Sequence, residues 1–215
     1  MIEYFNEDCM AGMARYPDKY FDLAIVDPPY GIGITDSGRL GKYNKNDIRW
    51  DDNIPDDKYF SELFRVSKSQ VIWGGNYFNL PATRGFVIWD KKQPQGVSFA
   101  SCEFGWSSFD TSAKTFYLSA MNTGENRLHP TQKPVALYKW LLKNYAKPGD
   151  LILDTHVGSA SSLIACHDMG FDAVGFELDP DYYKASKRRL DDFMAQPKIE
   201  ELVIEKREQI AIGGD

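Results

Sequence analysis

Residues 151–177 read LILDTHVGSASSLIACHDMGFDAVGFE. Two short apolar runs with a helical segment between them predict a βαβ unit. Such a unit, with an acidic residue about 20 positions after the first strand, is typical of sites that bind a ribose-containing cofactor. Asp154 and Glu177 supply acidic ends for the two strands. The alternative interpretation is an ordinary strand-to-helix turn in which Gly158 serves only the backbone.

Short apolar runs and helical patterns alternate along the rest of the chain, which predicts an α/β fold. The expected strands are 2–5, 21–26, 71–73, 86–89, 103–109, 115–118, 151–153 and 173–176. The expected helices are 7–15, 57–67, 135–145, 159–169 and 180–193. Proline opens two of these helices, and Pro134 is expected in the first helical turn. The 215 residues, 43% of them hydrophobic, fit one domain over 1–196 and a tail over 197–215 with no assigned chemistry.

The formal net charge of the chain is -6 at pH 7, the opposite of the basic balance that is typical of nucleic-acid binders. Basic side chains nevertheless cluster locally, at Arg39, Lys42, Lys45 and Arg49 and again at Arg84, Lys91 and Lys92. A locally positive cleft and scattered solvated side chains are both compatible with this pattern.

Membrane-spanning segments, disulfide bonds and metal centres are not expected. No run approaches 18 apolar residues, and the first ten residues are acidic where a signal peptide needs a basic and then an apolar run. The sequence therefore predicts a cytoplasmic protein. The three cysteines and three histidines are scattered, which indicates neither a disulfide framework nor a metal centre.

The tetrapeptide Asp27-Pro28-Pro29-Tyr30 follows an apolar run, at the place where ligands gather in open α/β sheets. A carboxylate and a proline-fixed carbonyl can each accept a hydrogen bond from one planar amino group, which enriches the nitrogen lone pair. The tyrosine offers a flat face to an aromatic ring. A rigid proline turn with a half-buried tyrosine is the alternative.

Residues 129–134 read HPTQKP and lead into a predicted helix. The exposed backbone amides at that helix start, with Thr131 and Lys133 nearby, could hold a carboxylate. Taken alone, the segment is equally compatible with a polar turn.

Together the three motifs resemble the amino-methylating DNA methyltransferases that use S-adenosylmethionine, in the permuted order of the β group. The resemblance spans about residues 1–195, and it is reinforced by the segments 7–9, 73–76 and 176–180. Small members of phages and prophages are similar in size. The resemblance implies a Rossmann-like class I methyltransferase fold: a twisted, mostly parallel sheet with helices on both faces and a circularly permuted motif order.

The resemblance also implies a role for each motif. Asp27 and the Pro28 carbonyl would hold the target amino group, Pro29 would fix the turn, and Tyr30 would stack on the flipped base. The loop after residue 153 would hold the methionine part of the cofactor, and Glu177 its ribose hydroxyls. The residues expected to bind the cofactor are Asp8 and Cys9 near its adenine, Thr131, Gln132 and Lys133 near its carboxylate, and Asp154, His156, Gly158, Ser159, Ser161 and Glu177.

The cofactor loop departs from the family pattern Asp-Pro-Phe-x-Gly-Ser-Gly-Thr at four positions. Thr155 replaces the proline, His156 the phenylalanine, Ala160 the second glycine and Ser161 the threonine. The alanine methyl matters only if the site requires a positive φ. The histidine puts a polar ring where an apolar one is usual, so weaker cofactor binding is one expectation.

The resemblance implies methyl transfer from S-adenosylmethionine to the N6 amino group of adenine, since Asp rather than Ser at position 27 favours adenine over cytosine. Double-stranded DNA with a flipped adenine would be the substrate, contacted by segments 31–56 and 91–127. A homodimer is compatible with the resemblance. The functions that stay open beside it are an N4-cytosine or RNA methyltransferase, an inactive cofactor- or DNA-binding module, and a nicotinamide-dependent oxidoreductase.

Overall fold

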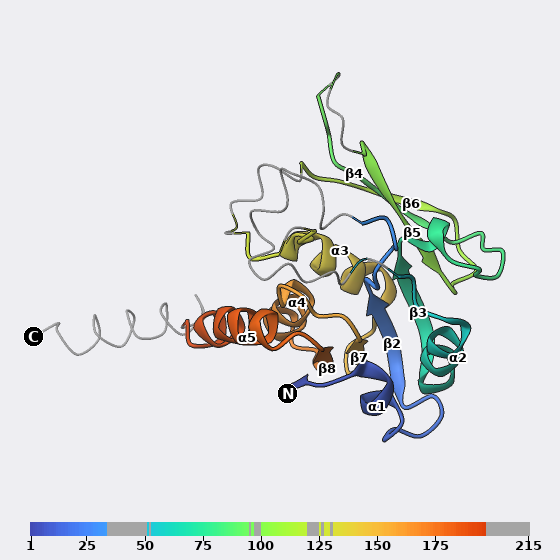
Figure 1. Ribbon diagram of the computed structural model, residues 1–215. Helices are drawn as coiled ribbons and strands as arrows, with labels where there is room; N and C mark the ends of the chain where they lie inside the picture. The colour runs from blue at the N-terminus through green and yellow to red at the C-terminus, as the bar shows by residue number, and fades with distance from the viewer. Residues whose placement is uncertain are drawn as a thin grey trace, which may run out of the picture.

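The described part of the computed structural model contains one sheet of eight strands, in the order β1-β8-β7-β2-β3-β5-β4-β6 (Figure 1). The strands are β1 (Ile2–Asn6), β2 (Phe21–Val26), β3 (Ser67–Trp73), β4 (Val87–Asp90), β5 (Cys102–Ser107), β6 (Lys114–Tyr117), β7 (Leu151–Asp154) and β8 (Asp172–Glu177). Strand β5 pairs antiparallel with β3 and β4, and every other pairing in the sheet is parallel. The expected mostly parallel α/β sheet is thus confirmed.

The structure describes residues 1–33, 51, 53–94, 96, 100–119, 125, 127–129 and 131–196. The tail predicted over 197–215 lies outside these residues. So do most of segment 31–56 and parts of segment 91–127, for which DNA contacts are expected. The basic cluster over 39–49 lies outside them as well, whereas Arg84, Lys91 and Lys92 are described.

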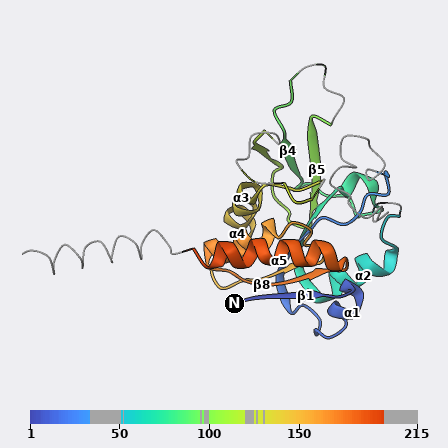
Figure 2. The same cartoon turned by 60° about the vertical axis from the view of Figure 1, so that its left-hand side comes forward.

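Helices cover both faces of the sheet. They are α1 (Cys9–Met13), α2 (Asp57–Val66), the 3-10 turn η3 (Gly75–Tyr77), α3 (Val135–Tyr145), α4 (Ser161–Met169) and α5 (Pro180–Met194). Leu23 and Ile25 of β2 pack in one apolar cluster with α3 and α4, whereas Ala24 and Val26 pack in another with α2. This alternation follows from the two-residue period of a strand that is buried on both faces. Figures 1 and 2 show α4 and α5 on one side of the sheet and α2 on the other.

The chain leaves the middle of the sheet in two directions. Strand β2 lies between β7 and β3. From β7 the chain crosses through α4 to β8, and from β2 it crosses through α2 to β3 on the opposite face and in the opposite direction. The loops that follow β2 and β7 therefore diverge, which opens a crevice at the carboxyl ends of these two strands.

Two expected elements match the structure residue for residue, namely the strand over 21–26 and the helix over 135–145. The first helix is shorter than predicted, because it starts only after Asp8, whose carboxylate caps Met10 N at 2.7 Å. Strand β3 starts at Ser67 rather than 71, because Ser67 and Gln70 are buried polar residues that bond to each other and carry no apolar pattern. Pro134 is the N-cap of α3 rather than its first helical residue.

Helix α4 begins at Ser161, two residues later than expected. Gly158 and Ala160 adopt left-handed backbone angles, with φ values of 54° and 64°, so the segment before Ser161 cannot be helical. Among the helices of the described residues, none has the length and apolar character needed to cross a membrane.

Gly175 of β8 allows the loop after β7 to pack onto the sheet. A Cβ at this position would lie 2.6 Å from Val157 Cγ2 and 3.0 Å from Leu163 Cδ1. We expect Gly175→Ala to lower the free energy of unfolding by about 1–3 kcal/mol, because the extra methyl overpacks a closed core. Urea denaturation measures the change. Glu3→Ala on neighbouring β1 is exposed and should change it by less than about 0.5 kcal/mol; an equally small loss for Gly175→Ala would contradict this account.

Candidate active site

A cavity of about 660 Å³ occupies the crevice at the carboxyl ends of β2, β7 and β8. This volume suits a small-molecule ligand. The expected site residues that line it are Asp8, Cys9, Asp27, Pro29, Thr131, Gln132, Lys133, His156, Gly158, Ser159 and Glu177. Four expected residues, Pro28, Tyr30, Asp154 and Ser161, lie around it without lining it. The fold thus brings most of the sequence-predicted candidates to one place.

Several lining residues were not among the cofactor-binding or catalytic residues expected from the sequence, although some of them belong to segments 31–56 and 176–180. Tyr59 of α2 and Tyr138 of α3 belong to apolar helix faces, and that pattern indicates core residues. Residues 53–56 and 178–180 also line the cavity. Their position directly before α2 and after β8 was the available signal, since loops at the carboxyl ends of parallel strands surround ligands in this type of fold.

The loop after β7 keeps its turn despite the alanine at position 160. Ala160 has a φ of 64° and is fully buried in the apolar cluster with Leu163. A left-handed conformation costs a non-glycine residue about 1–2 kcal/mol, and burial of the methyl group offsets part of this cost. The site therefore does require a positive φ, and the chain tolerates alanine there.

Glu177 joins the loop after β7 to the start of α5. Its Oε2 accepts a hydrogen bond from Gly158 N at 2.8 Å, and its Oε1 accepts one from Asp179 N at 3.0 Å. Burial raises the pKa of this carboxyl, and the two amide hydrogen bonds oppose the rise. Each carboxylate oxygen keeps a second lone pair, so Glu177 can still accept hydrogen bonds from a ligand in the cavity.

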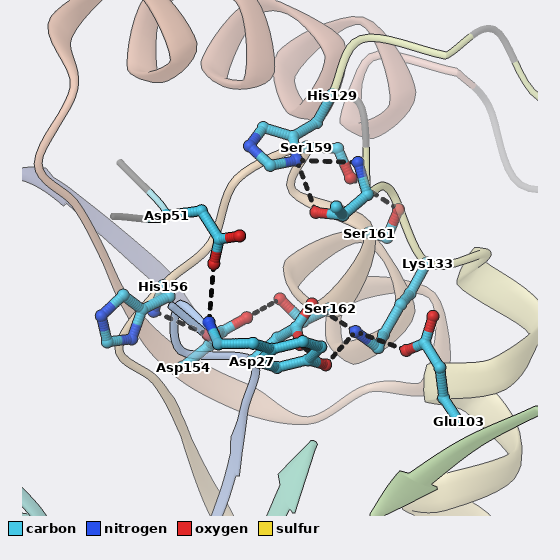
Figure 3. A network of polar contacts seen from close by, with 12 residues as sticks. Asp27, Asp51, Glu103, His129, Lys133, Asp154, His156, Ser159, Ser161 and Ser162 are labelled. Atoms are coloured by element: carbon cyan, nitrogen blue, oxygen red, sulfur yellow. Dashed lines mark hydrogen bonds and ion pairs between the residues drawn. The ribbon is translucent and has the colours of Figure 1, made fainter. Parts of the chain in front are cut away.

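Asp154 lies beneath the loop and is 2% exposed. It accepts hydrogen bonds from His156 N at 3.0 Å and from the Ser162 hydroxyl (Figure 3). Burial raises the pKa of its carboxyl to about 7. Asp154 therefore supports the loop from below, where it contacts backbone and hydroxyl groups of the chain itself.

His156 behaves as a neutral ring. Burial lowers its pKa to about 4, so it carries no charge at pH 7. Its edge meets Tyr59 with ring centroids 5.4 Å apart, and its Nδ1 lies 2.9 Å from Thr155 Oγ1. The Thr155 hydroxyl also bonds Tyr59 at 2.7 Å. Thr155 and His156, two of the substituted loop residues, thus form a hydrogen bond with each other.

The segment after β2 is held by Asp51, a residue that the sequence did not single out. The Asp51 carboxylate accepts hydrogen bonds from Tyr30 N at 2.7 Å and from Gly31 N at 3.1 Å, and the residue is 1% exposed. It follows a stretch without periodic apolar positions, so only the fold brings it back to the turn (Figure 3). The turn is therefore fixed by a buried side chain that accepts two backbone hydrogen bonds, as well as by its prolines.

The ring of Tyr30 already has aromatic and backbone neighbours. It stacks on Tyr77 of η3, with centroids 5.0 Å apart and planes 15° apart. A Cβ on Gly74 would lie 2.2 Å from Tyr30 Cε1, so glycine is needed there for the ring to fit. Tyr77 is 42% exposed. An aromatic partner thus covers Tyr30 in this structure.

Asp27 is held by two donors, one on each carboxylate oxygen. Its Oδ1 accepts a hydrogen bond from Tyr30 Oη at 2.6 Å, and its Oδ2 lies 2.5 Å from Lys133 Nζ. The Lys133 side chain is only 2% exposed. Lys133 was expected beside a cofactor carboxylate, and although it does line the cavity, its ammonium group is engaged by the chain's own Asp27 and Glu103.

The start of α3 is also occupied from within the chain. Val135 N donates a hydrogen bond to Glu125 Oε1 at 2.9 Å. The expectation that exposed amides at this helix start would hold a ligand carboxylate is therefore corrected at Val135, because Glu125 takes that place. His129 contacts Thr131 through Nδ1, and burial together with nearby Lys133 lowers its pKa to about 3.

The cavity is acidic. Among the described residues that line it, the carboxylates are Glu7, Asp8, Asp27, Asp56, Glu177 and Asp179, and the one lysine is Lys133. Both lining histidines have lowered pKa values and are neutral at pH 7. Such a lining favours a cationic or neutral ligand over a polyphosphate.

Comparison with known proteins identifies the family. The model of the DNA methylase family N6_N4_Mtase matches residues 70–188. The chain belongs to this DNA methylase family. The match starts within β3, so the Asp27–Tyr30 segment lies outside it.

A relative and two solved structures extend this finding. The chain is 24% identical over 236 residues to the type II methyltransferase M.HpaI of Haemophilus parainfluenzae, an alignment that covers 86% of this methylase and 72% of the relative. Its fold is similar to the M1.HpyAVI–SAM complex, with a TM-score of 0.63, 18% identity, and coverage of 89% of this chain and 100% of that chain. It is also similar to PvuII DNA methyltransferase, which is cytosine-N4-specific, with a TM-score of 0.60, 13% identity, and coverage of 89% and 90%. The expected methyltransferase fold is confirmed.

The buried carboxyl of Asp154 gives a testable pH dependence. Its pKa is about 7 in the folded chain against 3.8 for an ordinary Asp, so the folded state holds its proton over a range where the unfolded state has lost it. This contribution to stability is complete below pH 4 and is lost as the pH rises to 7. We expect Asp154→Asn, whose amide can keep both contacts, to lose less stability than the wild type between pH 4 and 7.

Denaturation with urea at a series of pH values measures this difference. Asp22→Asn is the matched control of opposite sign, because Lys68 and Leu151 N hold the pKa of Asp22 below its usual value although burial opposes them. Its stability relative to the wild type should fall as the pH rises toward 4 and stay level above it, because the contribution of a carboxyl with a lowered pKa is complete above its unfolded pKa of 3.8. Parallel pH profiles for the wild type and Asp154→Asn would contradict the role given to Asp154.

Proposed function

We propose that the chain transfers a methyl group from S-adenosylmethionine to the N6 amino group of adenine in DNA. The observation that carries this proposal is the position of Asp27, which follows the carboxyl end of β2 and lines the same cavity as Glu177 and the loop after β7. The amino group and the methyl donor could therefore meet in one crevice. Membership of the DNA methylase family supports this assignment.

The lining of the cavity fits S-adenosylmethionine. The cofactor would supply a methyl group on a positively charged sulfur, and the excess of carboxylates over the single described lysine favours such a cation. Glu177 has free lone pairs for ribose hydroxyls. Burial raises the pKa of the Cys9 thiol to about 12, so this residue is a neutral neighbour for an adenine rather than a nucleophile.

Asp27 and Pro28 would act on the target amino group by accepting hydrogen bonds. An exocyclic amino group has two hydrogens, and their engagement by a carboxylate and a backbone carbonyl leaves the nitrogen lone pair for attack. Catalysis then consists of positioning and electrostatic support, without a covalent enzyme intermediate. The base must leave the duplex to reach Asp27, and Tyr30 would stack on it after Tyr77 moves aside.

DNA contacts are assigned to segments 31–56 and 91–127, which flank the cavity-forming loops in the sequence. Segment 31–56 lies between β2 and α2, after the carboxyl end of a central strand, where substrate-binding loops belong in this fold. Segment 91–127 follows β4 and includes β5 and β6. A segment of this size suits a short recognition sequence. A homodimer that shares the reading of DNA is compatible with this arrangement.

N4-cytosine methylation is the second candidate. The name of the matched family, N6_N4_Mtase, covers both N6 and N4 amino-methyltransferases. The fold is similar to the cytosine-N4-specific PvuII DNA methyltransferase, with a TM-score of 0.60, and to the M1.HpyAVI–SAM complex, with a TM-score of 0.63. An exocyclic amino group on cytosine would present the same two hydrogens to Asp27 and Pro28. Asp at position 27 supports adenine by resemblance.

An inactive module, an oxidoreductase and an RNA methyltransferase have less support. The substituted loop is the motive for an inactive binding module, yet Ala160 keeps the left-handed turn and His156 is neutral. A nicotinamide-dependent oxidoreductase would bind a pyrophosphate, which the acidic lining disfavours. RNA as the polymer is compatible with the acidic net charge of the chain.

The experiment that tests the function is tritium transfer from labelled S-adenosylmethionine to DNA and to RNA, followed by digestion and mass spectrometry of the nucleosides. N6-methyladenine in DNA is the expected product. N4-methylcytosine would select the second candidate, and methylated RNA would change the substrate. Binding of DNA without binding of the cofactor would favour the inactive module.

We expect Asp27→Asn to slow methyl transfer at least about 100-fold, because the amide has no negative charge and keeps only one of the two acceptor oxygens. Cofactor affinity measured by calorimetry should change by less than about threefold. Asp90→Asn, at the end of β4 and outside the cavity lining, is the matched control and should retain transfer. Loss of transfer and of cofactor binding to the same extent would overturn the role of Asp27.

We expect Glu177→Ala to weaken binding of S-adenosylmethionine at least about tenfold, because a charged acceptor and the tether of Gly158 N are removed together. Isothermal titration measures the affinity. Glu7→Ala is the matched control: this carboxylate also lines the cavity, but both its oxygens already bind Arg15, so its loss should change the affinity less than about threefold. Equal affinities for the wild type and Glu177→Ala would remove Glu177 from the cofactor site.

A further inference from the structure

Lys133 connects Asp27 to a second, partly buried carboxylate, Glu103. Its Nζ lies 2.5 Å from Asp27 Oδ2, 3.1 Å from Tyr30 Oη and 3.1 Å from Glu103 Oε2 (Figure 3). The rings of Tyr30 and Trp73 flank the ammonium group, with centroids 5.6 Å and 5.5 Å away. A lysine that is 2% exposed needs such partners, because burial of an unpaired charge is costly.

Glu103 comes from β5, the strand that runs against the rest of the sheet. Its Oε1 pairs with Lys91 Nζ at 2.5 Å, while its Oε2 faces Lys133 as an ion pair without a well-aligned hydrogen bond. The Glu103 side chain is 21% exposed and that of Asp27 is 17% exposed. The order of charges is therefore Asp27, Lys133, Glu103 and Lys91, alternating in sign from the cavity outward.

Among the described residues, the tyrosines near Asp27 are neutral at pH 7. Tyr30 donates its hydroxyl hydrogen to Asp27, and burial raises the pKa values of Tyr59 on α2 and Tyr138 on α3 well above the ordinary tyrosine value. Asp154 of β7 has a raised pKa of about 7. Lys133 is thus the cation that faces Asp27, and Glu103 is the carboxylate that shares it.

We propose that Glu103 is a positioning residue that acts on Asp27 through Lys133. The Glu103 carboxylate forms an ion pair with the buried ammonium group of Lys133. It therefore determines how close this ammonium group lies to Asp27 and how strongly Asp27 accepts hydrogen bonds. The inference rests on the proposed function, in which Asp27 receives the target amino group. It assigns a role to a strand residue that lies outside all three sequence motifs.

The alternating order of charges predicts that removal of the Lys133 charge and removal of the Glu103 charge change the pKa of Asp27 in opposite directions. Removal of the Lys133 charge leaves burial and the Glu103 charge opposed by the Tyr30 hydrogen bond, so the pKa of the Asp27 carboxyl rises. Removal of the Glu103 charge eliminates a like charge and releases Lys133 fully to Asp27, which lowers the pKa of Asp27. General damage to the site would not move the titration in two directions.

The experiment compares the wild type with Glu103→Gln and Lys133→Met by two measurements. The first is the pH dependence of kcat for methyl transfer, whose acid limb should shift down by about half a pH unit or more in Glu103→Gln and up by about one pH unit in Lys133→Met. The second is carbon NMR titration of protein labelled at the aspartate carboxyl carbon, with the Asp27 signal identified by its absence in Asp27→Asn. The titration midpoint should move in the same two directions.

Glu62→Gln is the matched control. Glu62 of α2 is a partly buried carboxylate paired with Arg65 at 2.6 Å, and it does not line the cavity. Neither the acid limb nor the Asp27 midpoint should change in this variant. Unchanged midpoints in Glu103→Gln, or shifts of both test variants in the same direction, would overturn the proposal.

The two readouts separate this inference from the proposed function. If the wild type transfers no methyl group to DNA or RNA, the proposed function fails, and the NMR titration still decides whether Glu103 controls Asp27. If transfer occurs and the midpoints do not move, the inference alone fails. If Lys133→Met does not fold, Glu103→Gln decides by itself, because glutamine keeps the size and polarity of the side chain.

Discussion

The parallel pairing of β2 with β7 is the constraint on which the site depends. Leu23 pairs with Ile152 and Ala24 with Leu153, which brings together two strands that are more than 120 residues apart in the chain. The crossovers that follow them turn to opposite faces and opposite edges of the sheet. A crevice is unavoidable where they part; Asp27 lines it, and Asp154 supports the loop that follows β7. A different neighbour for β2 would separate Asp27 from the loop that begins at Asp154.

Three carboxylates in or beside the crevice are stabilised in three different ways. Asp27 is paired with a cation, Lys133. Glu177 accepts hydrogen bonds from two backbone amides. Asp154 accepts from a hydroxyl and an amide, and burial raises its pKa to about 7. An ion pair keeps a charge available, amides orient a carboxylate while leaving lone pairs free, and a raised pKa suits a group that only supports the backbone. The physical environment thus divides three similar side chains among different tasks.

Sequence periodicity and motifs predicted the elements that depend on local apolar patterns. The strand Phe21–Val26 and the helix Val135–Tyr145 follow from uninterrupted apolar periodicity. The start of β3 could not be predicted in this way, because Ser67 and Gln70 satisfy each other's polar groups inside the sheet. The start of α4 depends on two left-handed residues, and one of them is an alanine, which carries no sequence signal for that conformation.

By itself, the sequence determined the α/β class and the location of the motifs at strand ends, and most of the site residues that it predicted line the cavity. These features follow from local patterns, since a strand end and its neighbouring loop are adjacent along the chain. Only the tertiary structure decided that Lys133 pairs with both Asp27 and Glu103, and that Asp51 accepts hydrogen bonds from the turn after β2. These contacts join segments that are distant in sequence, and their energy comes from burial of opposite charges and polar groups that meet only when the sheet is assembled.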